Sequence, residues 1–139
     1  MFVPKHHDGF CMFDTKTSDC NVMHTPFGRD YIKEISAART KSDVRFCLYY
    51  SIMDWTNPVY HGNSGAYLTE YEKVMKTHLT ELLTNYGPVG CMWFDGNWEG
   101  SWTHAYDRAS MLSCAGFSRP CWWTIEPSPE PAAANPIVM

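Results

Sequence analysis

Three short apolar runs, each ending in polar or reactive residues, constrain the fold of this 139-residue chain more than any other feature. They read "MFVPKHHD" from Met1, "VRFCLYYS" over residues 44–51 and "VGCMWFDG" over residues 89–96. Their continuous apolar character, without strict alternation, is typical of strands buried on both faces of a parallel sheet. We therefore predict one parallel strand in each run.

Two stretches with helical spacing separate these runs. The first is "DYIKEISAA" over residues 30–38, and the stronger one covers residues 69–86. Thr69 and Glu72 have the spacing of a capping box, and the Gly-Pro pair at 87–88 predicts the end of this second helix. One apolar stripe on it is expected to face the core: Tyr71, Val74, Met75, Leu79, Leu82, Leu83 and Tyr86.

The alternation of strands and helices predicts an α/β fold with a parallel sheet. In such sheets the functional groups gather at the carboxyl ends of the strands. The predicted strands end in "HHD" at residues 6–8, "YYS" at residues 49–51 and "WFDG" at residues 93–96. We therefore expect these three ends to deliver their side chains to one shared rim.

The residue types at this rim suit a sugar site. Aromatic rings pack on the apolar face of a pyranose, imidazoles hydrogen-bond its hydroxyls, and a carboxylate such as Asp95 can attack the anomeric carbon. Taken alone, an aspartate before a glycine is also common as a turn residue. Its setting beside two histidines and several aromatic residues favours the catalytic interpretation.

A metal site and a Ser-His-Asp triad are the main alternatives. His6 and His7 are adjacent, so on a strand they would point to opposite faces and would not bind one ion together. The other histidines have no HExxH spacing, and no serine lies in a GxSxG elbow. We therefore expect no metal and no cofactor.

Composition excludes several classes of partner. A net charge of −4 offers no basic surface for nucleic acid or for a membrane. No apolar run approaches the roughly 20 residues of a membrane helix, and no secretory signal pattern is present. The six cysteines lie apart without a CxxC pair, which argues against a zinc ribbon or a redox motif. Cys47 and Cys91, inside apolar runs, are expected to be free buried thiols.

Three segments resemble the α-L-fucosidases of glycoside hydrolase family 29. They are "KHHDGFCMFDTKTSDCNVMHTPFGRD", "YYSIMDW" and "LLTNYGPVGCMWFDGNWEG", in that order. The resemblance runs from about Phe2 to His104. Cys20 stands where the family usually has an aromatic residue, and His24 replaces a usual asparagine. Neither departure touches the matched site positions.

The resemblance implies a (β/α)8 TIM barrel that releases terminal α-L-fucose from fucosylated oligosaccharides and glycoconjugates by retaining hydrolysis. It implies Asp95 as the nucleophile, which forms a covalent fucosyl-enzyme intermediate. His6 and His7 would bind fucose hydroxyls, with Tyr49 and Trp93 beside them. The family resemblance implies neither a location nor an oligomeric state for this chain, although its members are often secreted, periplasmic or lysosomal.

Only part of such a barrel is expected in this chain. A (β/α)8 barrel needs about 250 residues, so we assign residues 1–105 to a partial barrel with about three parallel strands and their helices. Retaining hydrolysis also needs a second carboxylate, the general acid/base. We assign that role neither to Glu99 nor to the later Glu126 and Glu130. A catalytically inactive fragment or a weak sugar-binding remnant therefore stays open as an alternative.

Residues 106–139 differ in character from the rest. They show no periodicity, and we expect a non-homologous, disordered tail. The codons of "CWWTIE" at residues 121–126 can also be translated in a shifted reading frame that starts at the third base of each codon. In that frame they encode Leu-Val-Asp, then one variable residue, then Arg or a stop. In the resembling family, a helix and a strand ending in a similar sequence follow "WFDG". We therefore predict a frameshift near Ala105, in which case Trp122 and Trp123 have no function.

Overall fold

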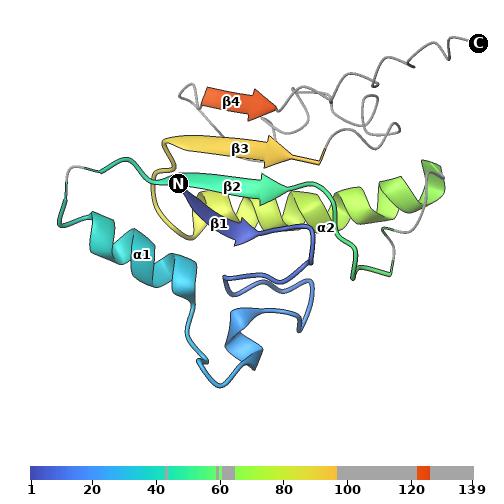
Figure 1. Cartoon of the computed structure of the whole chain (residues 1–139), viewed down its shortest axis with the longest axis horizontal. Helices are drawn as coiled ribbons and strands as arrows, with labels where there is room; N and C mark the ends of the chain where they lie inside the picture. Colours follow the sequence, from blue (N-terminus) through green and yellow to red (C-terminus); the bar gives the residue numbers. More distant parts are fainter. Residues whose placement is uncertain (43, 59, 61–64, 97–121, 126–139) are drawn as a thin grey trace, which may run out of the picture.

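The computed structural model describes residues 1–42, 44–58, 60, 65–96 and 122–125, with backbone only for 65–69 and 122–125. Its strands and helices alternate along the chain (Figure 1). In chain order they are β1 (Phe2–Lys5), the short 3-10 helix η1 (Val22–His24), α1 (Tyr31–Arg39), β2 (Cys47–Ser51), α2 (Gly65–Thr84), β3 (Cys91–Asp95) and β4 (Trp122–Ile125). The three predicted strands and two predicted helices are all present.

The four strands form one parallel sheet in the order β1-β2-β3-β4. The α/β class and the parallel sheet predicted from the sequence are therefore confirmed. The strand β4 lies inside the segment for which the sequence predicts a disordered tail, and it pairs with β3 from Cys91–Trp122 to Phe94–Ile125. The rest of that segment, and the position of the predicted frameshift, lie outside the described residues.

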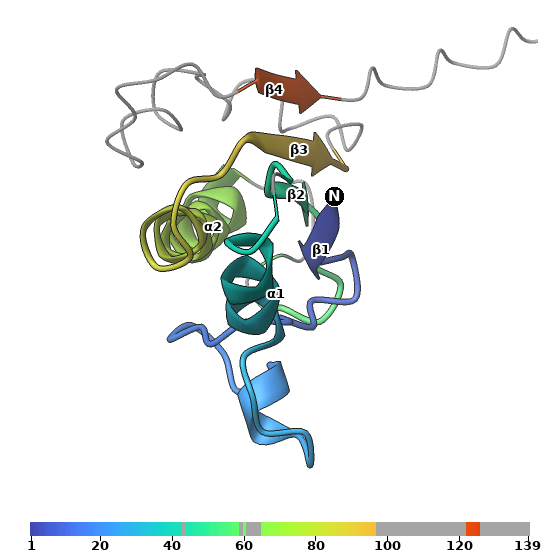
Figure 2. The same ribbon diagram turned by 90° about the vertical axis from the view of Figure 1, so that its left-hand side faces the viewer.

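Helices α1 and α2 both lie against the same face of the sheet (Figures 1 and 2). Four buried strand residues point to this helix-covered face and form the centre of the core: Leu48, Tyr50, Met92 and Phe94. Residues at the alternate positions point to the opposite face and are only half-buried: Cys47, Tyr49, Cys91 and Trp93. The prediction of strands buried on both faces is therefore wrong for the described sheet, which has helices on one face only.

Helix α1 begins where the sequence pattern places it. The carboxylate of Asp30 caps the helix, because Oδ1 accepts a hydrogen bond of 2.8 Å from the amide of Lys33. Its Oδ2 accepts further bonds from the Asp14 amide and the Tyr86 hydroxyl. The same side chain thus ties the start of α1 to the loop after β1 and to the end of α2.

Helix α2 confirms the predicted apolar stripe but not the predicted cap. Five of the seven stripe residues are buried, and Val74 and Leu83 pack against the core at its margin. The helix begins at Gly65, four residues before Thr69, so the pair Thr69 and Glu72 is not a capping box. Within the described part of the chain, no helix is both long and apolar enough to span a bilayer.

Candidate active site

The candidate site lies at the carboxyl ends of β1, β2 and β3. Strand β1 ends at Lys5, and the chain turns at once, with the amide of Gly9 donating to the carbonyl of His6 at 3.1 Å. Strands β2 and β3 are in register, so that Ser51 lies opposite Asp95 at their last residues. The shared rim that the sequence predicts is therefore present in the structure.

The two histidines lie together rather than on opposite faces. Their ring centroids are 4.2 Å apart, and one ligand atom each from His6, His7 and Asp95 lies within 4.8 Å of the others. The prediction that His6 and His7 point to opposite faces is wrong, because the strand ends at Lys5, before the first of them. This cluster can therefore surround a single sugar ring, and its spacing is also compatible with one cation.

The two oxygens of the Asp95 carboxylate have different surroundings. Only 8% of the residue is exposed. Its Oδ2 accepts a hydrogen bond from the Tyr49 hydroxyl and lies 3.8 Å from Nε2 of His7. Its Oδ1 is buried and has no hydrogen-bond partner among the described residues. One oxygen of the carboxylate is thus oriented by Tyr49, while the other is buried without a hydrogen-bond partner among the described residues.

The ring of His7 is oriented by Ser51. The Ser51 hydroxyl donates to the carbonyl of Met53 at 3.1 Å, so it can only accept from Nδ1 of His7, with which it is also hydrogen-bonded. Nδ1 therefore carries the proton, and Nε2 faces Asp95. Because Ser51 is fully buried and bound at both ends, it is not a nucleophile. The expectation that this site is not a Ser-His-Asp triad is consistent with this arrangement.

The exposed ring of His6 stacks on Tyr49. The two ring centroids are 5.4 Å apart with planes inclined by only 8°, and Nε2 of His6 lies 3.3 Å from the Tyr49 hydroxyl. Since that hydroxyl gives its single proton to Asp95, Nε2 of His6 is the donor in this pair. His6, Tyr49 and Asp95 thus form one hydrogen-bonded chain.

Two tryptophans flank the rim in different ways. Trp93 is half-buried, lies opposite Tyr49 in the β2–β3 register and shares its sheet face. Trp55 is 61% exposed, its ring centroid lies 5.3 Å from that of His7, and its amide donates to the His7 carbonyl at 2.8 Å. The sequence predicts Trp93 as a site residue but not Trp55, although "YYSIMDW" ends in it.

A buried lysine supports the rim from the helix-covered face. Lys5 is fully buried, and its ammonium group donates to the carbonyls of Ser51 and Met53 at 3.1 and 2.8 Å. It also lies 3.4 Å from the carboxylate of Asp54. Burial lowers the pKa of Lys5, and the nearby carboxylate of Asp54 opposes that shift. Apart from the position of the lysine before the two histidines, no feature of the sequence indicates this role.

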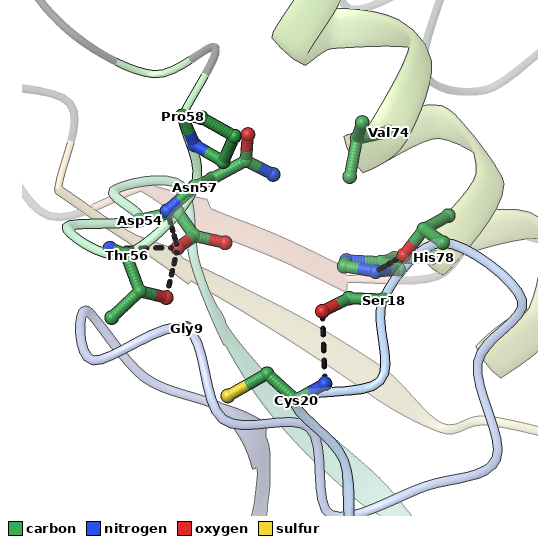
Figure 3. A pocket seen from close by; sticks show the side chains of 10 residues that line it. Gly9, Ser18, Cys20, Asp54, Thr56, Asn57, Pro58, Val74 and His78 are labelled. Atoms are coloured by element: carbon green, nitrogen blue, oxygen red, sulfur yellow. Dashed lines mark hydrogen bonds between the residues drawn. The ribbon is translucent and has the colours of Figure 1, made fainter.

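A cavity of about 260 Å³ lies beside the rim but does not include it (Figure 3). It is lined by the loops after β1 and β2 and by Val74 and His78 of α2, and none of the five predicted site residues contributes. Its polar groups are largely engaged with one another. Asp54, for example, accepts from the amides of Thr56 and Asn57 (Figure 3). We therefore place the chemistry at the rim and not in this cavity.

The sequence profile of the α-L-fucosidase family matches residues 1–125. This chain belongs to the α-L-fucosidase family. The match extends beyond Ala105, the boundary predicted for the partial barrel, to the last residue of β4. The resemblance noted from the sequence motifs is therefore confirmed.

Curated relatives of this fucosidase-family chain are similar over most of its length. The plasma alpha-L-fucosidase of Rattus norvegicus is 33% identical over 114 residues, which cover 78% of this chain and 24% of the relative. That of Homo sapiens is 36% identical over 98 residues, 67% of this chain and 21% of the relative. The chain thus spans less than a quarter of these two relatives.

Solved fucosidase structures share its fold. An alpha-L-fucosidase GH29 from Bacteroides thetaiotaomicron superimposes with a TM-score of 0.71 at 31% identity, over 82% of this chain and 28% of that one. Isoenzyme 1 from Paenibacillus thiaminolyticus gives a TM-score of 0.68 at 31% identity, over 80% and 30% of the two chains. The described sheet and helices therefore correspond to part of a larger fucosidase structure.

Proposed function

We propose that this chain carries the nucleophile side of a retaining α-L-fucosidase site, in which Asp95 attacks the anomeric carbon of a terminal α-L-fucose. The observation that supports this most is the unequal environment of the two Asp95 oxygens. The Tyr49 hydroxyl donates to Oδ2, whereas Oδ1 is buried and has no hydrogen-bond partner among the described residues. A carboxylate fixed in this way is oriented for attack through one oxygen.

The reaction has two displacements. An oxygen of the Asp95 carboxylate forms a bond to the anomeric carbon while the glycosidic C–O bond breaks, and the leaving oxygen takes a proton from a general acid. Water then displaces the carboxylate and gives up a proton, so fucose is released with retained configuration. The structure of a trapped covalent intermediate of an alpha-L-fucosidase GH29 from Bacteroides thetaiotaomicron, in complex with 2-fluoro-fucosyl fluoride, supports a covalent step of this kind.

The neighbours of Asp95 supply the sugar contacts in this proposal. Nε2 of His7, with its proton fixed on Nδ1, accepts a hydrogen bond from a fucose hydroxyl. His6 offers a second imidazole from the exposed side of the rim. Tyr49 and Trp93 present aromatic surface on the same face of the sheet. The substrate is then a fucosylated oligosaccharide or glycoconjugate, and the rest of a (β/α)8 barrel would enclose it.

The general acid/base is not identified in this proposal. It would lie about 5–5.5 Å from the nucleophile in a retaining enzyme. Asp54, a buried acid next to the rim, is engaged by Lys5 and by the Thr56 and Asn57 amides, so we do not assign it that role. A substrate with a good leaving group reduces the need for the acid, and this guides the choice of probe.

Hydrolysis of 4-nitrophenyl α-L-fucoside by the full 139-residue chain tests the proposal. We expect release of nitrophenol that falls at least about 1,000-fold in Asp95→Asn, because an amide does not form the glycosyl ester. Asp19→Asn, on a side chain that is 96% exposed, is the matched control and should keep the activity. Equal rates for Asp95→Asn and the parent chain would refute Asp95 as nucleophile.

Two other outcomes would indicate a different function. Binding of L-fucose without hydrolysis would favour the sugar-binding remnant over the enzyme. The close spacing of His6, His7 and Asp95 supports a metal-dependent hydrolase as the second candidate. That candidate predicts loss of hydrolysis on dialysis against EDTA and recovery with Zn²⁺, whereas the retaining mechanism predicts the same rate before and after dialysis.

A further inference from the structure

Two cysteines form a second cluster of reactive side chains, away from the rim. Cys47 and Cys91 are the first residues of β2 and β3 and lie directly opposite each other in the parallel register. Both are half-buried, neither is in a disulfide, and both point to the face of the sheet without helices. Neither takes part in the proposed fucosidase chemistry.

The backbone geometry at this position suits a covalent link. Neighbouring strands lie about 4.7–4.9 Å apart, and the Cα atoms of disulfides are usually about 4.4–6.8 Å apart. Directly opposed residues of β2 and β3 therefore meet the Cα requirement. Both side chains also leave the sheet on the same face, because the two residues are opposed in the parallel register.

We propose that Cys47 and Cys91 form a cross-strand dithiol that a low-molecular-weight disulfide such as glutathione disulfide converts into an intramolecular disulfide. One cysteine, as the thiolate, attacks a sulfur of glutathione disulfide and releases one glutathione thiolate. The second cysteine then attacks the mixed disulfide and releases the other. The two protein thiols lose two electrons and two protons, and one glutathione disulfide becomes two glutathione thiols.

The surroundings of the pair set its rate of reaction. Burial, followed by the neighbouring Cys47 thiol, raises the pKa of Cys91 above its usual value. Little thiolate is then present at neutral pH, so oxidation should be slow at pH 7 and faster at pH 9. The link would join the strands at their amino ends, four residues and roughly 13 Å from the rim residues Ser51 and Asp95.

The other described cysteines provide the internal comparison. Cys11 is fully buried, and desolvation raises its pKa to about 12, so its thiol should react slowly. Cys20 is exposed, and its carbonyl accepts from the Cys11 amide at 3.0 Å, which makes a Cys11–Cys20 bridge the competing product. A bridge in that position would not require the strand pairing on which the proposal depends.

Peptide mapping of the 139-residue chain after native incubation with millimolar glutathione disulfide tests the proposal. We expect a loss of two hydrogen atoms and a linked peptide pair containing Cys47 and Cys91. The link should be lost in Cys47→Ser and in Cys91→Ala and kept in Cys20→Ser. We also expect the Tm of the oxidised parent chain to rise by about 5–15 °C and to return with dithiothreitol.

The mapping of the parent chain decides the matter even if a variant fails to fold. A bridge from Cys11 to Cys20, or glutathione adducts on Cys47 and Cys91 without a link between them, would overturn the proposal. The result is independent of fucoside hydrolysis, which measures the opposite end of the strands. A negative result for fucoside hydrolysis therefore does not affect the test of the disulfide, and the reverse is also true.

Discussion

Lys5 is the buried charge on which the rim depends most. Its partners are the carbonyls of Ser51, the last residue of β2, and of Met53, the carboxylate of Asp54 and the hydroxyl of Tyr71 on α2. Ser51 in turn fixes the proton of His7. We therefore regard Lys5 as a positioning residue for the imidazole and not as a group that touches the sugar.

Replacing Lys5 by methionine should destabilise the chain strongly. The variant leaves the carboxylate of Asp54 buried without its cation, a loss that typically costs about 3–5 kcal/mol. Urea unfolding followed by circular dichroism would measure the change. The exposed Lys33→Met in α1 is the control and should cost less than about 0.5 kcal/mol. Equal losses in the two variants would show that the ion pair does not hold the rim.

The buried His78 should make the stability of the fold depend on pH. It is 2% exposed, bonded to the Tyr50 hydroxyl at 2.8 Å and to the Thr17 hydroxyl. Burial, and then the charge of Lys5, lowers its pKa from 6.5 to about 3. Between these values the unfolded chain binds a proton that the folded chain does not, so stability should fall as the pH decreases from 6.5 toward 3.

The substitution His78→Gln isolates this contribution. Urea unfolding at pH 7 and at pH 4.5 should show a larger loss of stability on acidification for the parent chain than for the variant. A glutamine at this position does not titrate, so whatever loss remains comes from other groups. Identical losses in both proteins would contradict the assignment of a neutral, buried His78.

The sequence could supply the identity of the site residues but not all of their partners. His6, His7, Tyr49 and Asp95 were predicted from the strand ends and from the family resemblance, and the structure brings them together. Their roles in catalysis stay predictions. The sequence places Ser51 at the rim, but it does not predict the contact of Ser51 with His7 or the role of Lys5, because contacts between residues 44 or more positions apart have no local signature in a single sequence.

At the level of elements, the turn after β1 fits tightly against the loop after β2. Gly9 has a φ of +75°, and a Cβ atom there would overlap the side chains of Thr56 and Asp54. The Thr56 hydroxyl also donates to the carbonyl of Asp8 at 3.2 Å. The glycine thus allows the histidine turn and the following loop to close on each other.

Gly9→Ala should therefore separate the two loops. We expect a loss of more than about 3 kcal/mol, since strain from positive φ adds to the overlap. Gly28→Ala is the matched control. Its φ is +56°, but its Cβ would lie 3.7 Å from the nearest atom, so only about 1–2 kcal/mol of backbone strain is expected. Thermal melts of both variants give the comparison, and a smaller loss for Gly9→Ala would contradict it.

The elements themselves followed largely from periodicity. The stripe on α2 and the apolar runs of β2 and β3 are strong local signals, and the structure confirms them. The end of β1 and the start of α2 were misplaced by a few residues. Strand β1 ends at Lys5, whose side chain bonds to the end of β2, and the chain then turns. Helix α2 begins earlier than expected, at Gly65. The pattern of apolar and polar residues encodes neither of these boundaries.

For the molecule as a whole, the last strand raises a question about the coding sequence. The family profile matches up to Ile125, and β4 occupies the position next to β3 that a barrel's next strand would take. The predicted frameshift near Ala105 stays a prediction. Sequencing of the nucleotides around that codon should show a shifted frame that reads through a helix into Leu-Val-Asp. A stop codon or an unrelated peptide in that frame would contradict it.

In the proposed site, Asp95 is the nucleophile, and the fucose ring that it attacks lies between His6, His7 and Tyr49. Intact-mass analysis of the full chain after incubation with 2-fluoro-fucosyl fluoride tests it most directly, because fluoride leaves without help from a general acid. If Asp95 is the nucleophile, we expect one 2-fluoro-fucosyl ester per chain, mapped to Asp95 and absent in Asp95→Asn. An adduct on another residue, or no adduct on a folded chain, would contradict it.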